Sequence, residues 1–151
     1  MGKVVAGAKI PCRVSRTLDV GDFSMLHQLN WFNMAIHSNS EYGKTTWFKE
    51  RSLAGPLIFT VCDGLLHNAD NISEMLENDG YEIYAYIAVD NLKLTSPCLF
   101  GDTLTANAEV VDLRPTKNPE MFLFIYKNKP TNQRGQQVCE YQTTMMVKKK
   151  A

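Results

Sequence analysis

The helix that organises this fold is encoded by LAGPLIFTVCDGLLH at residues 53–67. Gly55 and Pro56 stand at its start, and proline suits the first position of a helix because its missing N–H would have no partner there. Apolar residues then recur at helical spacing, namely Leu57, Ile58, Val61, Leu65 and Leu66. The stretch therefore predicts a largely buried helix that begins near Ala54.

The helical pattern continues beyond this stretch with an interruption. A break is expected at residues 67–71, and a second helical piece follows from Ile72 to Leu76. Asn78, Asp79 and Gly80 end it, since glycine readily adopts the left-handed conformation after a helix. The helical region as a whole is predicted to run from about Ala54 to Asn78.

Strand patterns dominate the rest of the chain. Alternating apolar and polar residues predict strands at 81–94, 103–113, 121–127 and 138–147, with a loop at 114–120 and a turn at 132–135. Residues 1 to about 50 have a mixed pattern of short strand-like pieces and polar turns. One apolar helical region followed by long antiparallel strands predicts α+β architecture in a single domain of residues 1–151. The other face of the sheet, or its edges, would then need cover, and dimerisation is the simplest way to supply it.

Composition excludes several classes of function. The 151 residues carry 16 basic and 16 acidic side chains, so no basic excess favours nucleic-acid binding, and the run Lys148–Lys150 is interpreted as a solvated tail. No apolar segment approaches the roughly 20 residues that span a bilayer. Residues 1–10 lack an export pattern, and the four cysteines show neither CxxC nor zinc-ligand spacing. We expect a cytoplasmic protein with free cysteines, no metal site and no membrane or nucleic-acid partner.

Five segments, in their order along the chain, resemble the MaoC-like family of (R)-specific enoyl-CoA hydratases and dehydratases. They are DVGDF at 19–23, IHSNSEY at 36–42, LAGPL at 53–57, SPCLFGDTL at 96–104 and NQRGQQV at 132–138. The resemblance covers nearly the whole chain. It implies a hot-dog fold, in which an antiparallel sheet wraps around one long central helix.

The resemblance also implies a substrate and a way of binding it. The expected partner is an acyl thioester of coenzyme A or of an acyl carrier protein, with no cofactor, bound by a homodimer or a larger homo-oligomer. Ala54 and Gly55 match the place that holds the thioester carbonyl. A helix N-terminus offers free N–H groups there, and glycine allows close approach. The alternative is that Gly55 serves only tight packing of helix on sheet.

The catalytic loop of the family departs from its pattern in this chain. The family motif is Gly-Asp-x-Asn-Pro-x-His, and aligning its histidine with His37 puts Phe32 at the aspartate, Met34 at the asparagine and Ala35 at the proline. His37 is therefore the expected acid–base residue, because a phenyl ring accepts no proton.

The absence of the family's aspartate leaves three alternatives open. If the loop stays helical, Asn30, Asn33 and His37 share one face and an asparagine positions the water while His37 moves the proton. Otherwise Asp22 or Asp63 supplies a carboxylate, and an unpaired Asp63 in a buried helix would have a raised pKa. In the third alternative, the site still binds a thioester but no longer catalyses its hydration or dehydration.

These observations favour a hydratase or dehydratase that acts on an acyl thioester, with an unusual branched, dicarboxylic or secondary-metabolite acyl group. Trp31 and Trp47 beside the presumed acyl channel would make it short or flat, and Phe32 is a further candidate contact, although all three aromatic residues more commonly belong to the core. His27 and His67 are interpreted as surface or packing residues. The alternatives are thioester hydrolysis or cyclisation on the same scaffold, and a non-catalytic partner subunit that binds thioesters.

Overall fold

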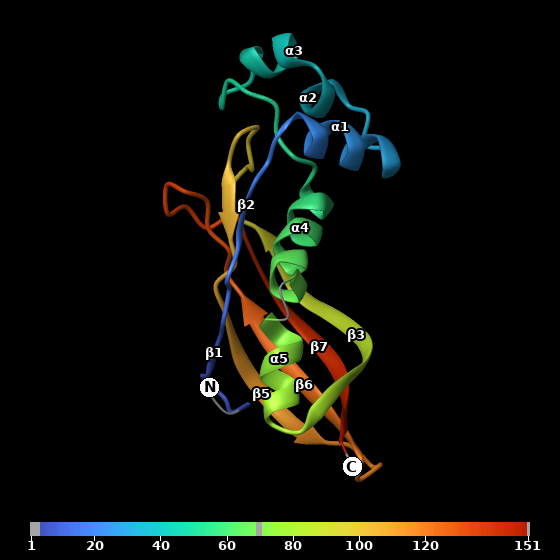
Figure 1. Cartoon of the computed structure of the whole chain (residues 1–151). Coiled ribbons are helices and arrows are strands. Elements are labelled where there is room, and N and C mark those ends of the chain that lie inside the picture. Colours follow the sequence, from blue (N-terminus) through green and yellow to red (C-terminus); the bar gives the residue numbers. More distant parts are fainter. Residues whose placement is uncertain (1–3, 69–70, 151) are drawn as a thin grey trace.

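The computed structural model describes residues 4–68 and 71–150 of the chain (Figure 1). Its helices are α1 (Val20–Leu29), α2 (Ala35–Ser38), α3 (Ser40–Thr45), α4 (Gly55–His67) and α5 (Asn71–Asn78). Its strands are β1 (Lys9–Ile10), β2 (Ser15–Thr17), β3 (Tyr81–Leu94), β4 (Thr103–Thr105), β5 (Ala108–Pro115), β6 (Met121–Asn128) and β7 (Cys139–Lys149).

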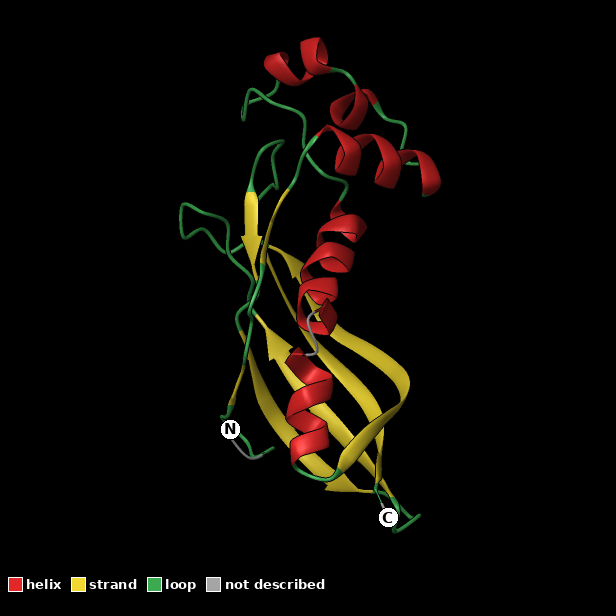
Figure 2. Ribbon diagram, viewed as in Figure 1, coloured by secondary structure: helices red, strands yellow, loops and turns green. Residues whose placement is uncertain are grey.

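The strands form a five-stranded antiparallel sheet in the order β1-β5-β6-β7-β3, beside a two-stranded pair of β2 and β4. The sheet curls around α4 and α5, while α1, α2 and α3 form a helical cap at one end of the molecule (Figure 2). The predicted α+β class, with an antiparallel sheet wrapped around a central helix, is confirmed. The cap comprises residues 20–45, and this name is used for it below.

The central helical region follows the sequence pattern closely. Helix α4 has Pro56 in its first turn and Ala54 as its N-cap, and it buries the apolar side chains that the spacing singled out. Two helices rather than one fill the concave face, as the expected interruption implied; Ala69 and Asp70, within that interruption, lie outside the described residues. Gly80 follows α5 with φ of 84°, the left-handed conformation expected at this helix end.

The strand predictions hold with two corrections. The predicted strand 103–113 is two strands, because β4 pairs with β2 whereas β5 pairs with β6, so the chain changes sheets between them. The predicted loop 114–120 begins later, since Arg114 and Pro115 still pair with Leu123 and Phe122. Lys148 and Lys149 also belong to β7 rather than to a tail.

The N-terminal third differs most from its prediction. Short strand-like pieces and turns were expected over residues 1 to about 50, but residues 20–45 fold into three helices. Within the described residues 4–50, the strands are β1 and β2. Helix α1 begins with a capping box, in which the Asp19 carboxylate accepts the backbone N–H of Asp22 and the Asp22 carboxylate accepts that of Asp19. The segment 19–23, one of those that resemble the family, therefore forms the start of a helix.

Three of the four free cysteines are buried in the core, namely Cys62, Cys98 and Cys139. Among the described residues, no helix is long and apolar enough to cross a membrane.

Candidate functional site

His37 lies in the cap on α2, and its ring is oriented by a carbonyl from the segment that leads to α4. Its Nδ1 lies 2.7 Å from the Ser52 carbonyl oxygen. A carbonyl only accepts hydrogen bonds, so Nδ1 carries the proton and the neutral ring leaves Nε2 with a free lone pair. This tautomer is the one that can take a proton from a ligand through Nε2.

The N-terminus of α4 presents a backbone donor beside His37. The N–H groups of Leu57 and Ile58 bond to the Ala54 carbonyl, and Pro56 has no N–H. Among the described residues, no hydrogen bond engages the N–H of Gly55, so this group is the donor that the first turn leaves for a ligand. The positive end of the helix dipole strengthens it.

A hollow of about 330 Å³ joins these two features. His37 and Gly55 both line it, which brings together the expected acid–base residue and the expected carbonyl-binding residue. The remaining lining residues are Ser52, Leu53, Ile58 and residues 94–97. Most of its lining surface is apolar, and its polar side chains are those of His37, Ser52, Thr95 and Ser96.

Leu94, the last residue of β3, covers Gly55. A Cβ on residue 55 would collide with the Leu94 side chain, so a glycine is needed for this contact as the structure stands. Leu94 is itself 52% exposed and has a flexible side chain. The tight packing expected as the alternative role of Gly55 is therefore present.

A second histidine lies at the same site and was missed by the sequence analysis. The ring of His27, on α1, stacks on that of His37 with centroids 4.9 Å apart and an angle of 13° between planes. Its Nε2 accepts the N–H of Ala54 at 3.1 Å. His27 is a packing residue, as expected, but its partners belong to the candidate site; its sequence context, between Leu26 and Gln28, gives no sign of them.

The segment between α1 and α2 is not the continuous helix that would align Asn30, Asn33 and His37. Helix α1 ends at Leu29, and Trp31 has φ of 61°, in the left-handed region, which turns the chain. The Asn30 amide donates to the Leu26 carbonyl at 2.9 Å, and Asn33 is exposed. That helical alignment is wrong because the backbone reverses at Trp31.

The aromatic residues expected at the acyl channel do not line the hollow. Trp31 and Trp47 are 87% and 80% exposed, so their interpretation as core residues is wrong. Phe32 is partly buried and packs against the hydrophobic core. The family's aspartate position is thus filled by a packed phenyl ring.

Asp63 lies on α4 but faces the sheet, about 12 Å along the helix from Gly55 at 1.5 Å per residue. Its carboxylate accepts the hydroxyls of Tyr126 at 2.7 Å and Tyr86 at 3.1 Å, and His67 Nε2 lies 3.5 Å away. Burial is the strongest influence on its pKa and raises it, but the interactions with His67, Tyr126 and Tyr141 together outweigh burial and hold the pKa below its ordinary value. The raised pKa was expected only for an unpaired Asp63, and that condition is not met because the carboxylate is paired.

Asp22, the other carboxylate considered, is engaged within α1. It completes the capping box and forms an ion pair with Arg16. Neither Asp22 nor Asp63 lines the hollow at His37. Among the described residues, no group of three or more His, Cys, Asp or Glu side chains is arranged to hold a metal ion.

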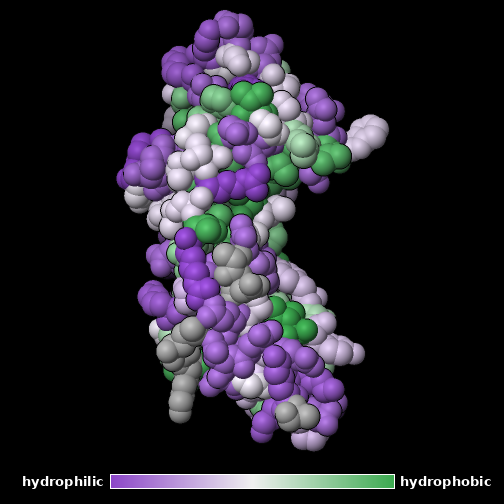
Figure 3. All heavy atoms as spheres, in the orientation of Figure 1, coloured by the Kyte–Doolittle hydropathy of each residue, from purple (hydrophilic) through white to green (hydrophobic). Residues whose placement is uncertain are grey.

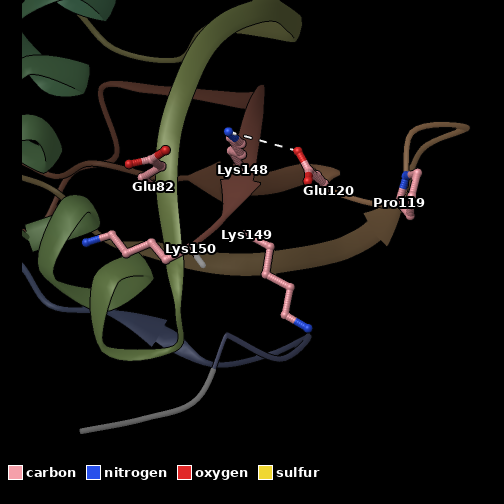
Figure 4. Close-up of a pocket in the computed structure, with 6 residues that line it drawn as sticks. All are labelled: Glu82, Pro119, Glu120, Lys148, Lys149 and Lys150. Atoms are coloured by element: carbon pink, nitrogen blue, oxygen red, sulfur yellow. Dashed lines mark ion pairs between the residues drawn. The ribbon is translucent and has the colours of Figure 1, made fainter.

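A different hollow, of about 400 Å³, lies at the opposite end of the molecule beside the C-terminal lysines (Figure 4). Lys148 pairs with Glu120 at 4.0 Å, and Lys150 pairs with Glu77 at 3.7 Å. Glu82 and Glu120 line the hollow together with the three lysines, and the lining contains no histidine or helix N-terminus. This hollow does not combine the groups found at His37.

The sequence matches no protein-family model and no curated protein sequence. The fold, in contrast, matches solved structures over nearly the whole chain. A MaoC-like dehydratase from Rhodospirillum rubrum has a TM-score of 0.80 and 16% identity, covering 97% of this chain and 94% of that one. An (R)-hydratase from A. caviae involved in PHA biosynthesis has a TM-score of 0.71 and 22% identity, covering 95% and 96%.

The 3R-hydroxyacyl-ACP dehydratase complex HadBC from Mycobacterium tuberculosis has a TM-score of 0.74 and 13% identity, covering 94% of this chain and 96% of that one. All three matches extend over the cap as well as the sheet, since each covers more than nine-tenths of this chain. At these identities the likeness establishes a shared fold. The chain therefore has the hot-dog fold of the MaoC-like dehydratases and (R)-hydratases.

Proposed function

We propose that this protein hydrates or dehydrates an acyl thioester bound in the hollow between His37 and Gly55. One observation carries the proposal: the Ser52 carbonyl fixes the His37 tautomer that leaves Nε2 free, at a hollow shared with the free N–H of Gly55. The two groups are a proton acceptor and a carbonyl-binding donor, which are the two functions that the reaction needs.

In the dehydration direction, His37 Nε2 removes the proton from the α carbon of a β-hydroxyacyl thioester. The electron pair of that C–H bond forms the double bond between the α and β carbons as the C–O bond at the β carbon breaks. The imidazolium returns the proton to the departing hydroxyl, which leaves as water. Because Phe32 stands at the aspartate position, one histidine performs both transfers, and hydration is the reverse.

Gly55 stabilises the charge that develops on the thioester oxygen during this reaction. Its N–H would bond to that oxygen at the positive end of α4, where the enolate-like transition state carries negative charge. The Leu94 side chain must turn aside to admit the thioester, since it covers Gly55. The apolar walls from Leu53, Ile58 and Leu94 favour a small or branched acyl group, carried by coenzyme A or by a carrier protein.

Asn30 and Asn33 stay proposals for positioning water, since both stand next to the turn that precedes α2. Thioester hydrolysis would require a free carboxylate at the hollow, and both Asp63 and Asp22 are engaged elsewhere. A non-catalytic thioester-binding subunit is the second candidate. It is favoured by the phenyl ring of Phe32 at the aspartate position and by the cover of Leu94 over Gly55.

The active form is proposed to be a homodimer built on β3. This strand lies at the edge of the sheet and exposes several large apolar side chains, namely Ile83, Tyr84, Tyr86, Ile87, Leu92 and Leu94. A long apolar edge strand of this kind requires cover. Pairing with a second copy would supply it and place the partner next to Leu94 at the hollow.

The test is turnover of crotonyl-CoA and a panel of branched and dicarboxylic enoyl-CoA esters, followed by loss of the enoyl-thioester absorbance. Removing a working acid–base group costs about 10²- to 10⁴-fold, so His37→Ala is expected to lower the rate by that amount. Ser38→Ala, in the same short helix, is the matched control and should keep the rate. Absence of turnover by the unaltered protein, with ester binding that His37→Ala leaves intact, would favour the non-catalytic subunit.

A further inference from the structure

His27 connects three parts of the candidate site through one buried ring. The side chain is 2% exposed and lies on α1, where its Nδ1 is 2.7 Å from the Phe23 carbonyl. Its Nε2 accepts the N–H of Ala54, the N-cap of α4, across 27 positions of sequence. One face of the ring stacks on His37.

These contacts are compatible with only one protonation state of His27. The Phe23 carbonyl accepts, so Nδ1 must carry a proton, whereas the Ala54 N–H donates, so Nε2 must not. The protonated ring would direct an N–H at the N–H of Ala54. The ring is therefore neutral, with the same Nδ1–H tautomer as His37.

The surroundings of His27 favour this neutral state. Burial, followed by the neighbouring charges of His37 and Arg51, outweighs the opposing hydrogen bond to the Phe23 carbonyl and holds the His27 pKa below its ordinary value. The Arg51 guanidinium lies over the Phe23 ring at 5.3 Å and the Phe100 ring at 4.9 Å, beside the stacked histidines. A cation on His27 would therefore lie close to the positive charge of Arg51.

We propose that His27 is a positioning residue that holds the His37 ring and the N-terminus of α4 in register. The neutral ring supports His37 from one face, while the Ser52 carbonyl fixes it from its edge. The bond to Ala54 sets the backbone at the residue before Gly55, and so orients the Gly55 N–H. The catalytic consequence rests on the proposed function, whereas the structural consequence stands without it.

Two variants separate the hydrogen bond from the bulk of the ring. His27→Phe keeps an aromatic ring against His37 but cannot accept the Ala54 N–H. His27→Gln retains an acceptor at about the place of Nε2. Both are compared with the unaltered protein, first by NMR of the histidine ring nitrogens and of the Ala54 and Gly55 amides, and then by kinetics on the best thioester.

In the unaltered protein both His27 and His37 are expected to show the Nδ1–H tautomer. His27→Phe should shift the Ala54 and Gly55 amide resonances and lower kcat by about 10- to 100-fold with a smaller change in KM, because misplacement of about 1 Å can cost 10²-fold. His27→Gln should restore the amide resonances and most of kcat. A purely structural role would lower the amount of folded protein and not kcat per folded molecule.

A folded His27→Phe protein with unchanged Ala54 and Gly55 resonances and an unchanged His37 tautomer would overturn the proposal. If His27→Phe does not fold, the same criteria apply to His27→Gln, whose amide resonances should then match those of the unaltered protein. If the unaltered protein turns over no thioester, the proposed function fails, but the NMR comparison still decides whether His27 positions the site.

Discussion

At the scale of single residues, His27 is a buried group whose protonation should couple to folding. The His27 pKa lies below its ordinary value of 6.5 in the folded chain, so near and below that pH the unfolded chain binds a proton that the native chain does not. Because proton binding then favours the unfolded chain, the free energy of unfolding decreases as the pH falls through 6.5. The decrease ends once the folded His27 also binds its proton.

We therefore expect the free energy of unfolding to decrease between pH 7.5 and pH 5.5, and the decrease to be smaller in His27→Gln. Urea unfolding of the two proteins at both pH values measures it, and the difference between them isolates His27 from the other titrating groups. An equal decrease in both proteins would show that His27 titrates alike in the folded and unfolded chains.

Residue-scale features were also the least accessible to sequence reasoning. His37 and Gly55 were identified through the family resemblance, and the structure brings them to one hollow. His27 was missed because the group that it accepts from, the Ala54 N–H, is distant in sequence and becomes a neighbour only after α1 packs on α4. The partners of Asp63 were missed for the same reason, since Tyr86 and Tyr126 lie on strands far along the chain.

At the scale of elements, the contact between the start of α4 and the end of β3 allows the two roles of Gly55 to be separated. Gly55→Ala would introduce a Cβ that meets Leu94, and the same Cβ would obstruct a thioester oxygen at the N–H. Loss of one oxyanion donor typically costs about 10²- to 10³-fold in kcat, so we expect Gly55→Ala to lose about 100-fold.

The double variant Gly55→Ala with Leu94→Ala decides between the two roles, with Leu94→Ala alone as its control. Truncation of Leu94 removes the packing collision but leaves the Cβ beside the N–H. We expect the double variant to stay as slow as Gly55→Ala on enoyl-thioesters. Recovery of the rate would instead mean that Gly55 serves packing alone.

Elements with strong periodicity could be predicted, and those held by side-chain caps and long-range pairing could not. Strand β3 has the bounds that its alternating pattern predicts, and the helical break after α4 was expected. The cap helices were missed because α2 and α3 have only 4 and 6 residues and α1 carries little apolar periodicity. The split of the predicted strand 103–113 depends on pairing with β2, which lies some 90 residues earlier and which local pattern does not reveal.

At the scale of the whole molecule, the proposed dimer can be tested by a substitution on the apolar edge strand β3. Ile87 is half exposed on β3, and replacing it with lysine would place charges against a partner strand. Like charges across an interface are costly, so we expect Ile87→Lys to weaken the dimer by at least about 10- to 100-fold. Sedimentation or light scattering across a dilution series measures the change.

Gln28→Lys, which adds the same charge to an exposed position on α1, is the matched control and should leave the dimer intact. A protein that is monomeric before any substitution would contradict the proposed pairing of β3. A dimer that persists unchanged in Ile87→Lys would place the interface on another surface. The apolar surface over the cap, visible in green in the upper part of Figure 3, is then the next face to substitute, through exposed Met25, Leu29 and Met34.

Both tryptophans of the chain, Trp31 and Trp47, lie at or beside the cap with most of their surface in water, and none lies in the sheet. Their indoles will emit as solvated fluorophores even in the native protein. Melting of the sheet will therefore change tryptophan emission little, whereas any rearrangement of the cap and its neighbouring loop would alter the environment of both. The intrinsic fluorescence of this protein therefore reports only on the end of the molecule where the thioester is proposed to bind.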